Sequence, residues 1–306
     1  MAFAPKVGCG VKLGGLILLS ALAAHATTYC VTIAGLGGEP DYEQHFASWA
    51  NEIDKTLKGG GSDVKSDVLT GAKATKANLQ TTLGALAKLA TAGDSIVLMM
   101  IGHGSFDNVE YKIELPGPDI SAEELAALLD RIPAQRQLVV NMTSASGASL
   151  HALQKPNRTV MTATRNGTEK NATVFARFWV EALRDPAADA DKNEVISALE
   201  AFTYATAKTK QFYETQKRLA TEHPAIDGGD KQGPLMAGRF PLMRIGAIKN
   251  AANDPVKQPL LAKREQIEQQ IDNLKLQKAA MPIDDYRKQL SVLLLELAKT
   301  QEELDK

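Results

Sequence analysis

The chain has little cysteine, few aromatic residues and almost no net charge, and each shortage excludes a class of protein. Only two cysteines occur among 306 residues, Cys9 and Cys30, so no disulfide framework holds the fold. Aromatic residues make up 5% and the formal net charge is -1, which argues against nucleic-acid binding. Past the N-terminus, no run approaches the roughly 20 apolar residues of a membrane span. The remaining class is a globular protein with one large domain and an appendage.

The N-terminus has the layout of a secretion signal. Two lysines precede an apolar run over residues 13–24, and Ala24-His25-Ala26 fits a small-x-small cleavage site. We therefore expect residues 1–26 to be removed and the mature protein to be exported, either periplasmic or secreted.

Cys9 leaves with this signal, so Cys30 stands alone in the mature chain. It lies inside an apolar segment with strand character, Thr28 to Ala34. We predict a buried, inert thiol there, because a catalytic cysteine in the middle of a strand would not reach a substrate.

Residues 27–221 alternate between strand and helix patterns. Apolar strands that alternate with amphipathic helices are typical of a parallel sheet covered on both faces. We therefore predict an α/β fold with a three-layer αβα sandwich around a mostly parallel sheet. The expected strands are 28–34, 64–70, 95–101, 137–143 and 158–163, and the expected helices are 41–57, 76–90, 121–130, 171–184 and 196–220.

Two further segments follow this domain. Glycine, proline and aspartate cluster over residues 222–258, which predicts a loop-rich cover or linker. From residue 259 to 306 apolar residues fall at heptad spacing on two helices, with a break at Met281-Pro282. This pattern predicts an antiparallel helical hairpin or short coiled coil, which would form a homodimer, bind a protein partner or pack back on its own domain.

Two apolar runs end in residues with catalytic chemistry. The run over 95–101 leads into His103-Gly104, and the run over 137–143 leads into Ser144. In an open α/β sheet, ligands bind at the carboxyl ends of the strands. The sequence therefore predicts a cleft where these two strand ends meet.

An acyl-transfer site needs a nucleophile, a proton-transfer group and donors for the oxyanion. Ser144 offers a hydroxyl, His103 an imidazole, and the backbone amides of Gly104 and Ser144 would serve as the donors. Thr143 and Ser146 flank Ser144 and are alternatives for the hydroxyl.

Four matched pieces carry a family resemblance over residues 28–220. They are the strand that ends in His-Gly-Ser at 103–105, the hairpin after it, the acidic helix start at 119–125, and the strand that leads to Ser-Ala-Ser-Gly at 144–147. Together they resemble the legumain-like and caspase-like cysteine peptidases of the caspase–hemoglobinase fold, in which the last piece reads Cys-x-Ser-Gly. The resemblance implies a caspase-like fold.

The resemblance also implies roles. His103 would assist proton transfer, Ser144 would occupy the place of the nucleophilic cysteine, and the amides of Gly104 and Ser144 would form the oxyanion hole. A thiol has a pKa of about 8.5, whereas a serine hydroxyl is far less acidic and needs a well-aligned base. We therefore predict a peptidase-like protein that is degenerate because serine replaces cysteine. The alternative is a non-enzymatic peptide-binding or scaffold module.

An acidic loop over residues 189–200 has the oxygen spacing of an EF-hand calcium loop. Its departure is Glu194, where the motif places a glycine in a left-handed turn that is costly for other residues. The other interpretation is an acidic turn between helices in which Ser197 caps the next helix, and we favour it. We expect no cofactor beyond weakly bound Ca²⁺. The ligands would be Asp189, Asp191, Asn193, the Val195 carbonyl, Ser197 and Glu200.

Overall fold

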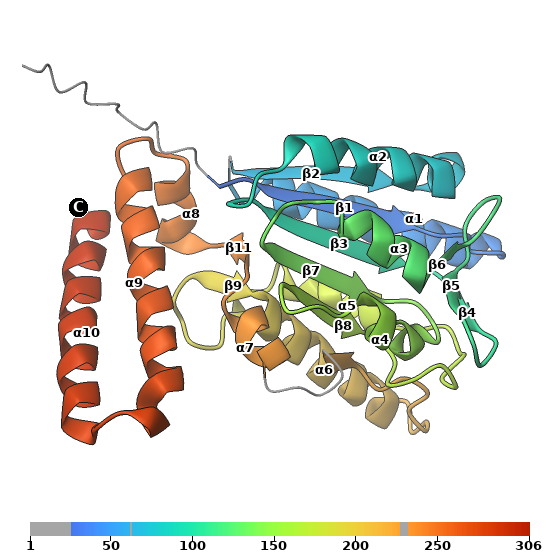
Figure 1. Cartoon of the computed structure of the whole chain (residues 1–306). Helices are drawn as coiled ribbons and strands as arrows, with labels where there is room; N and C mark the ends of the chain where they lie inside the picture. The colour runs from blue at the N-terminus through green and yellow to red at the C-terminus, as the bar shows by residue number, and fades with distance from the viewer. Residues whose placement is uncertain (1–25, 62, 227–231) are drawn as a thin grey trace, which may run out of the picture.

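A computed structural model describes residues 26–61, 63–226 and 232–306. The predicted signal, residues 1–26, lies outside these ranges apart from its last residue. A six-stranded sheet forms the centre of the molecule, in the order β10-β8-β7-β3-β1-β2 (Figure 1). All neighbours are parallel except the edge pair β10–β8. The strands are β1 Thr28–Ala34, β2 Val64–Leu69, β3 Ser95–Ile101, β7 Arg136–Asn141, β8 Arg158–Thr162 and β10 Ala225–Ile226.

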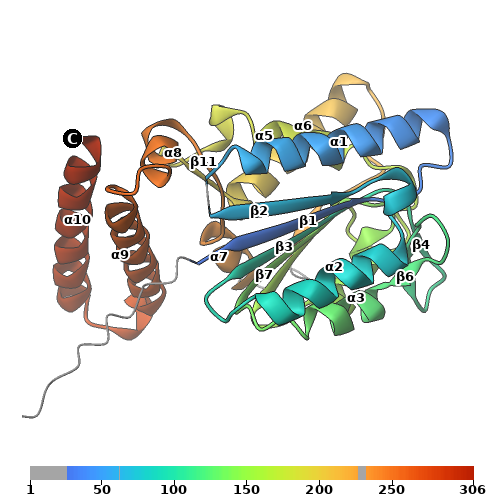
Figure 2. The ribbon, with the colours of Figure 1, turned by 90° about the horizontal axis from the view of Figure 1, so that it is seen from above.

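Helices cover both faces of this sheet, so the predicted three-layer sandwich is confirmed (Figure 2). Every residue of β3 is buried, as expected for a continuous apolar strand in the middle of a parallel sheet. One layer consists of α1 Pro40–Lys58, α5 Phe175–Ala182 and α6 Ala198–Thr215; the other consists of α2 Lys76–Leu89, α3 Ala122–Leu129 and α4 Leu150–Leu153.

Local capping explains where several helices begin. Thr75 accepts a hydrogen bond from the Asn78 amide at the start of α2. Ser121 and Glu124 form a capping box at the start of α3. Each cap satisfies amides that lack a partner inside the helix.

Two small antiparallel sheets flank the main one. The first, β4-β5-β6, follows the carboxyl end of β3 and includes the predicted hairpin. The second pairs β9 with β11 near the acidic loop. Their strands are β4 Gly104–Phe106, β5 Tyr111–Ile113, β6 Ile120–Ser121, β9 Val195–Ser197 and β11 Pro241–Arg244.

The segment 222–258 is more regular than predicted. It contains β10, β11, α7 Gln232–Gly238 and α8 Gly246–Ala252. Two parts of this segment are strands where its composition predicts loops, because β10 adds to the main sheet and β11 pairs with β9. These pairings join segments far apart in sequence, and local composition does not report them.

The predicted C-terminal hairpin is present. It consists of α9 Gln258–Gln277 and α10 Ile283–Asp305, which pack against each other (Figure 1). Leu261 of α9 and Leu304 of α10 also join a small core with Ile248 of α8, so the hairpin docks on its own chain. Within the described residues no helix is both long and apolar enough to cross a bilayer.

Candidate active site

The structure brings the ends of β3 and β7 together at one edge of the sheet. The two strands are parallel neighbours, with Met100 opposite Asn141. Beyond β3 the chain passes through Gly102 and His103 into β4, and beyond β7 it passes through Thr143 into Ser144. The predicted meeting of His103-Gly104 with Ser144 is therefore present in the fold.

Ser144 is held by the backbone of Gly104. Its Oγ accepts a hydrogen bond from the Gly104 N–H at 3.1 Å and donates one to the Gly104 carbonyl at 3.3 Å. The Ser144 residue is 2% exposed, so its hydroxyl has little access to solvent. We call this double hydrogen bond the Ser144–Gly104 clasp.

The clasp requires a glycine at position 104. A Cβ on Gly104 would lie 2.5 Å from the Ser144 carbonyl oxygen and 2.7 Å from Thr143 Oγ1. Directly after the clasp, Ala145 has a φ of 54°, in the left-handed region that non-glycine residues rarely adopt. The Ala145 amide donates to the Glu169 carbonyl at 2.8 Å, which helps to hold this turn.

The alternative hydroxyls are occupied elsewhere. Thr143 Oγ1 bonds to Tyr111 Oη at 2.5 Å and to Asn141 Oδ1 at 2.9 Å. Ser146 Oγ lies 3.2 Å from Thr164 Oγ1 and accepts from the Thr164 amide. Thr143 and Ser146 are fully buried. Their neighbour Tyr111 is buried as well, and this burial raises the pKa of its hydroxyl to about 12. These contacts make Thr143 and Ser146 structural residues.

The His103 ring packs against aromatic residues of α1. Its centroid lies 5.0 Å from that of Tyr42 and 5.2 Å from that of Phe46, and both pairs are edge-to-face. Within the described residues no hydrogen bond joins this ring to Ser144. The imidazole and the hydroxyl therefore share one edge of the sheet without forming a nucleophile–base pair in this state.

A groove opens beside His103, with a cavity of about 670 Å³. Tyr42 and Phe46, which contact the His103 ring, also line it. None of its lining residues is acidic, and both of its arginines, Arg177 and Arg218, are exposed. The lining is Tyr42, His45, Phe46, Trp49, Asn171, Ala172, Thr173, Val174, Arg177, Phe212, Tyr213, Arg218 and Thr221.

Glu222 is buried and bonds to two residues that line this groove, Val174 and Tyr213. Its carboxylate accepts from the Val174 and Phe175 amides at the start of α5 and from Tyr213 Oη. Burial is the main cause that raises the pKa of Glu222 to about 7, against the effect of these three donors. No periodicity or motif in the sequence marks Glu222.

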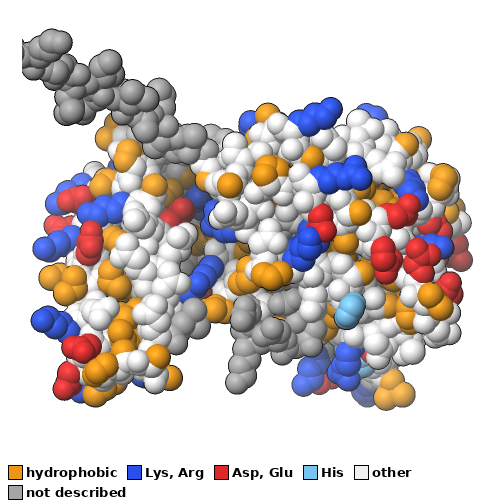
Figure 3. Space-filling model, in the orientation of Figure 1, with side chains coloured by type: hydrophobic (Ala, Val, Ile, Leu, Met, Phe, Trp, Pro, Cys, Tyr) orange, Lys and Arg blue, Asp and Glu red, His pale blue; other side chains and the backbone are white. Residues whose placement is uncertain are grey.

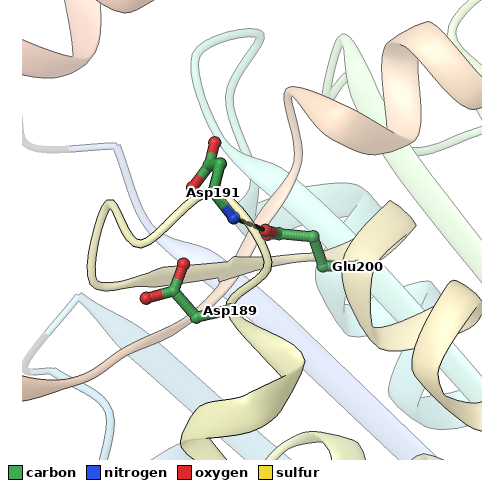
Figure 4. Close-up of side chains that lie close together, drawn as sticks. All are labelled: Asp189, Asp191 and Glu200. Carbon is green, nitrogen blue, oxygen red and sulfur yellow. Dashed lines mark hydrogen bonds between the residues drawn. The ribbon is translucent and has the colours of Figure 1, made fainter.

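The acidic loop places three of its carboxylates together. Asp189, Asp191 and Glu200 each have an oxygen within 4.8 Å of the others (Figure 4). Their lone pairs already have donors: Asp189 accepts from the Asn193 and Glu194 amides, and Glu200 accepts from the Asp191 amide. Burial, and then the charges of Glu200 and Asp189, raise the pKa of Asp191.

The other predicted ligands have different partners. Asn193 Oδ1 accepts from the Val195 amide at 2.8 Å, and Ser197 forms a capping box with Glu200 at the start of α6. The predicted cap is therefore confirmed. The helix begins at Ala198 instead of residue 196, because Val195–Ser197 pairs with β11 as a strand.

Glu194 adopts the left-handed conformation that the EF-hand motif assigns to glycine, with a φ of 64°. The structure compensates locally. Its Oε2 accepts from the Ile248 amide in the first turn of α8 at 3.0 Å, and its carbonyl accepts from the Ile245 amide. These bonds fix Glu194 to α8.

Cys30 lies mid-strand in β1 and is buried, as predicted. Burial, followed by the charge of Asp54, raises the pKa of this thiol to about 12. A thiol with such a pKa stays protonated at neutral pH and is a poor nucleophile.

No family model matches the sequence, and no curated protein matches it either. Among solved structures the chain is similar to caspase-1 from Spodoptera frugiperda, at 12% identity and a TM-score of 0.46, over 66% of this chain and 86% of that one. It is also similar to a structure named pro-sf-caspase-1, with the same identity and TM-score, over 66% and 91%. This likeness concerns the fold alone. The legumain-like resemblance and the serine nucleophile stay predictions.

Proposed function

We propose that this protein is a degenerate peptidase-like protein of the legumain or caspase type, which binds a peptide without cleaving it. The observation that supports this most directly is the Ser144–Gly104 clasp. The hydroxyl in the nucleophile position accepts the Gly104 N–H, the same group that would stabilise an oxyanion. A hydroxyl in this arrangement serves as a structural bond and also occupies the donor that catalysis needs.

Among the residues that the structure describes, no base bonds to the Ser144 hydroxyl, and this supports the same proposal. A serine nucleophile is activated by an adjacent base within hydrogen-bond reach, and that base needs its own orienting partner. Ser144 Oγ donates to the Gly104 carbonyl, and the His103 ring packs against Tyr42 and Phe46. The proton of the Ser144 hydroxyl therefore goes to a backbone oxygen.

The groove beside His103 supports peptide binding. Its aromatic residues supply apolar surface, and exposed Arg177 and Arg218 supply positive charge without a lining carboxylate to neutralise it. Arginine binds carboxylates in a bidentate geometry, and tryptophan, tyrosine and arginine are enriched among the few residues that dominate the binding energy of protein interfaces. We infer that the ligand is a peptide with acidic side chains next to an aromatic or aliphatic one.

Peptide binding is tested with fluorescent acidic and basic peptide libraries on the mature protein. We expect acidic peptides to bind, and Arg177→Ala with Arg218→Ala to weaken them at least 10-fold, a loss of about 1.4 kcal/mol. Arg287→Ala, an exposed arginine on α10, is the matched control and should bind like the parent. Equal binding of both libraries would overturn the ligand assignment.

Cleavage of the same peptides is tested in parallel with Ser144→Ala and Ser144→Cys. We expect no cleavage by the parent or by the alanine variant. Activity that appears only in the cysteine variant would show that the site lost catalysis through this residue. Turnover by the parent that disappears with Ser144→Ala would contradict the proposal and establish a serine peptidase.

Export is part of the proposal and rests on the sequence of residues 1–26. The expected mature N-terminus is Thr27, and the mature chain would be periplasmic or secreted. N-terminal sequencing of the protein purified from its native cells tests this, because an uncleaved Met1 would contradict it.

A further inference from the structure

The outer face of α10 is a second surface, on which exposed apolar residues lie between charged ones. This helix packs on α9, on the side of α9 that faces away from the central sheet (Figures 1 and 2). Tyr286, Thr300 and Leu304 are its buried residues. Among the described residues nothing packs on the opposite face of the helix, where Lys288, Leu295 and Glu302 are exposed.

This outer face has an apolar centre. Val292 and Leu295 are each 60% exposed, and Leu294 beside them is 48% exposed. Figure 3 shows hydrophobic side chains between charged ones on this end of the molecule. Val292 and Leu295 are three residues apart, so they are neighbours on one face of the helix, whereas Leu294 lies about 100° further around the axis and lines a groove beside α9.

Charged residues on this face occur in pairs at equal distances in sequence before and after Leu295, and the two members of each pair have opposite signs. Lys288 and Glu302 lie seven residues before and after Leu295, and Asp284 and Lys306 lie eleven before and after it. Seven residues are about two helical turns and eleven are about three, so Asp284, Lys288 and Glu302 share the face of Leu295. Lys306 follows the last residue of α10 and its ammonium lies 3.2 Å from Glu302 Oε1. All four are exposed.

We propose that a second copy of this chain docks on this face, with the two α10 helices antiparallel and a two-fold axis at Leu295. In that arrangement Lys288 meets Glu302 of the partner and Asp284 meets its Lys306, and the symmetry forms each pair twice. Leu295 packs on its own copy, and Val292 lies opposite Ala298. A parallel arrangement would instead place Lys288 against Lys288, so the charges select the antiparallel one.

The expected affinity is modest. One pair of helices buries an area at the low end of specific interfaces, below roughly 1,200 Å². We therefore expect a dimer that forms in the range of about 10–100 µM. The groove beside His103 is not part of this interface, so this inference does not depend on the proposed function.

Sedimentation velocity of the mature chain tests the dimer at protein concentrations of about 5–200 µM, which span the expected dissociation constant. Leu295→Glu should weaken association at least 10-fold. Leu219→Glu is the matched control, because Leu219 is 91% exposed and lies outside the hairpin, and it should associate like the parent. Circular dichroism verifies that both variants keep their helix content. A parent that stays monomeric at 200 µM, or a Leu295→Glu variant that dimerises normally, overturns the proposal.

A charge swap tests the antiparallel register. Lys288→Glu alone and Glu302→Lys alone each create two like-charge pairs and should weaken association. The double variant Lys288→Glu/Glu302→Lys restores opposite charges across the axis and should recover most of the parent's affinity. If the double variant associates as weakly as the single variants, Lys288 and Glu302 do not meet across the axis and this register is overturned.

Discussion

Replacing Ser144 by alanine tests whether the clasp holds the two strand ends together. The substitution removes only the hydroxyl, and with it both hydrogen bonds to Gly104, at 3.1 and 3.3 Å. Its effect on stability depends on whether these two backbone groups have another partner.

The sheet pairing shows that they do not find one in β5. The Glu114 amide donates to the His103 carbonyl, and Gly104 is the next residue, opposite Ile113. In an antiparallel ladder hydrogen-bonded and non-hydrogen-bonded positions alternate, so the N–H and C=O of Gly104 point away from β5 and toward Ser144. Gly104 is buried, and water does not replace the lost partner without a rearrangement.

A buried polar group left without a partner costs about 1–3 kcal/mol. We therefore expect Ser144→Ala to lower the free energy of unfolding by about 2 kcal/mol. The assay is urea unfolding followed by circular dichroism. Ser105→Ala is the matched control: Ser105 is the exposed neighbour of Gly104 in β4 and should change stability by less than about 0.5 kcal/mol.

The result that refutes this reasoning is a Ser144→Ala variant as stable as the Ser105→Ala control. The clasp would then contribute nothing, and the buried hydroxyl would need another explanation, such as retention for catalysis. Ser144→Cys separates size from hydrogen bonding, because the larger sulfur is a weaker acceptor. We expect its stability to lie between those of the parent and the alanine variant.

Three further predictions concern the surroundings of the site. Gly147→Ala should destabilise by about 2 kcal/mol or more in the same urea assay, because its Cβ would lie 2.2 Å from the Arg165 carbonyl carbon; Gly84→Ala, with nothing within 4 Å, should not. Burial raises the pKa of Glu222 to about 7, so its stabilisation is complete below about pH 4.5 and is lost as the pH rises through 7. Between these pH values the free energy of unfolding should fall by up to about 3 kcal/mol, and Glu222→Gln should remove most of this fall. A variant with the same pH dependence as the parent would show that Glu222 does not cause it. Ca²⁺ at about 0.1 mM should leave the melting temperature unchanged, because backbone amides already donate to the carboxylates of Asp189 and Glu200. A clear rise of the melting temperature in calorimetry would establish a calcium site.

The central layers of the fold were predictable from the sequence because local signals and burial agree there. β3 is apolar throughout and buried throughout, and its predicted bounds are those of the structure. Thr75 and Ser121 cap the predicted helices α2 and α3, and threonine or serine directly before a helical pattern is a start signal that a sequence shows. Where a segment's own pattern and its tertiary environment require the same structure, a single sequence is enough.

Other features depend on distant partners. The Val195–Ser197 segment precedes a capped helix, but it becomes a strand because β11 pairs with it. Glu194 tolerates its left-handed φ of 64° because its carboxylate bonds to the Ile248 amide. The motif at His103 and Ser144 predicted that these residues meet, but not that Ser144 would bond to Gly104, since that depends on the direction of two backbone groups.

Intact-mass spectrometry after treatment of the mature protein with a fluorophosphonate tests the central claim most directly, because this reagent modifies activated serine nucleophiles. The clasp predicts no adduct on Ser144 in the folded protein, even at a large molar excess of reagent. A stoichiometric adduct that maps to Ser144 and disappears with Ser144→Ala would contradict the claim and show an active serine enzyme.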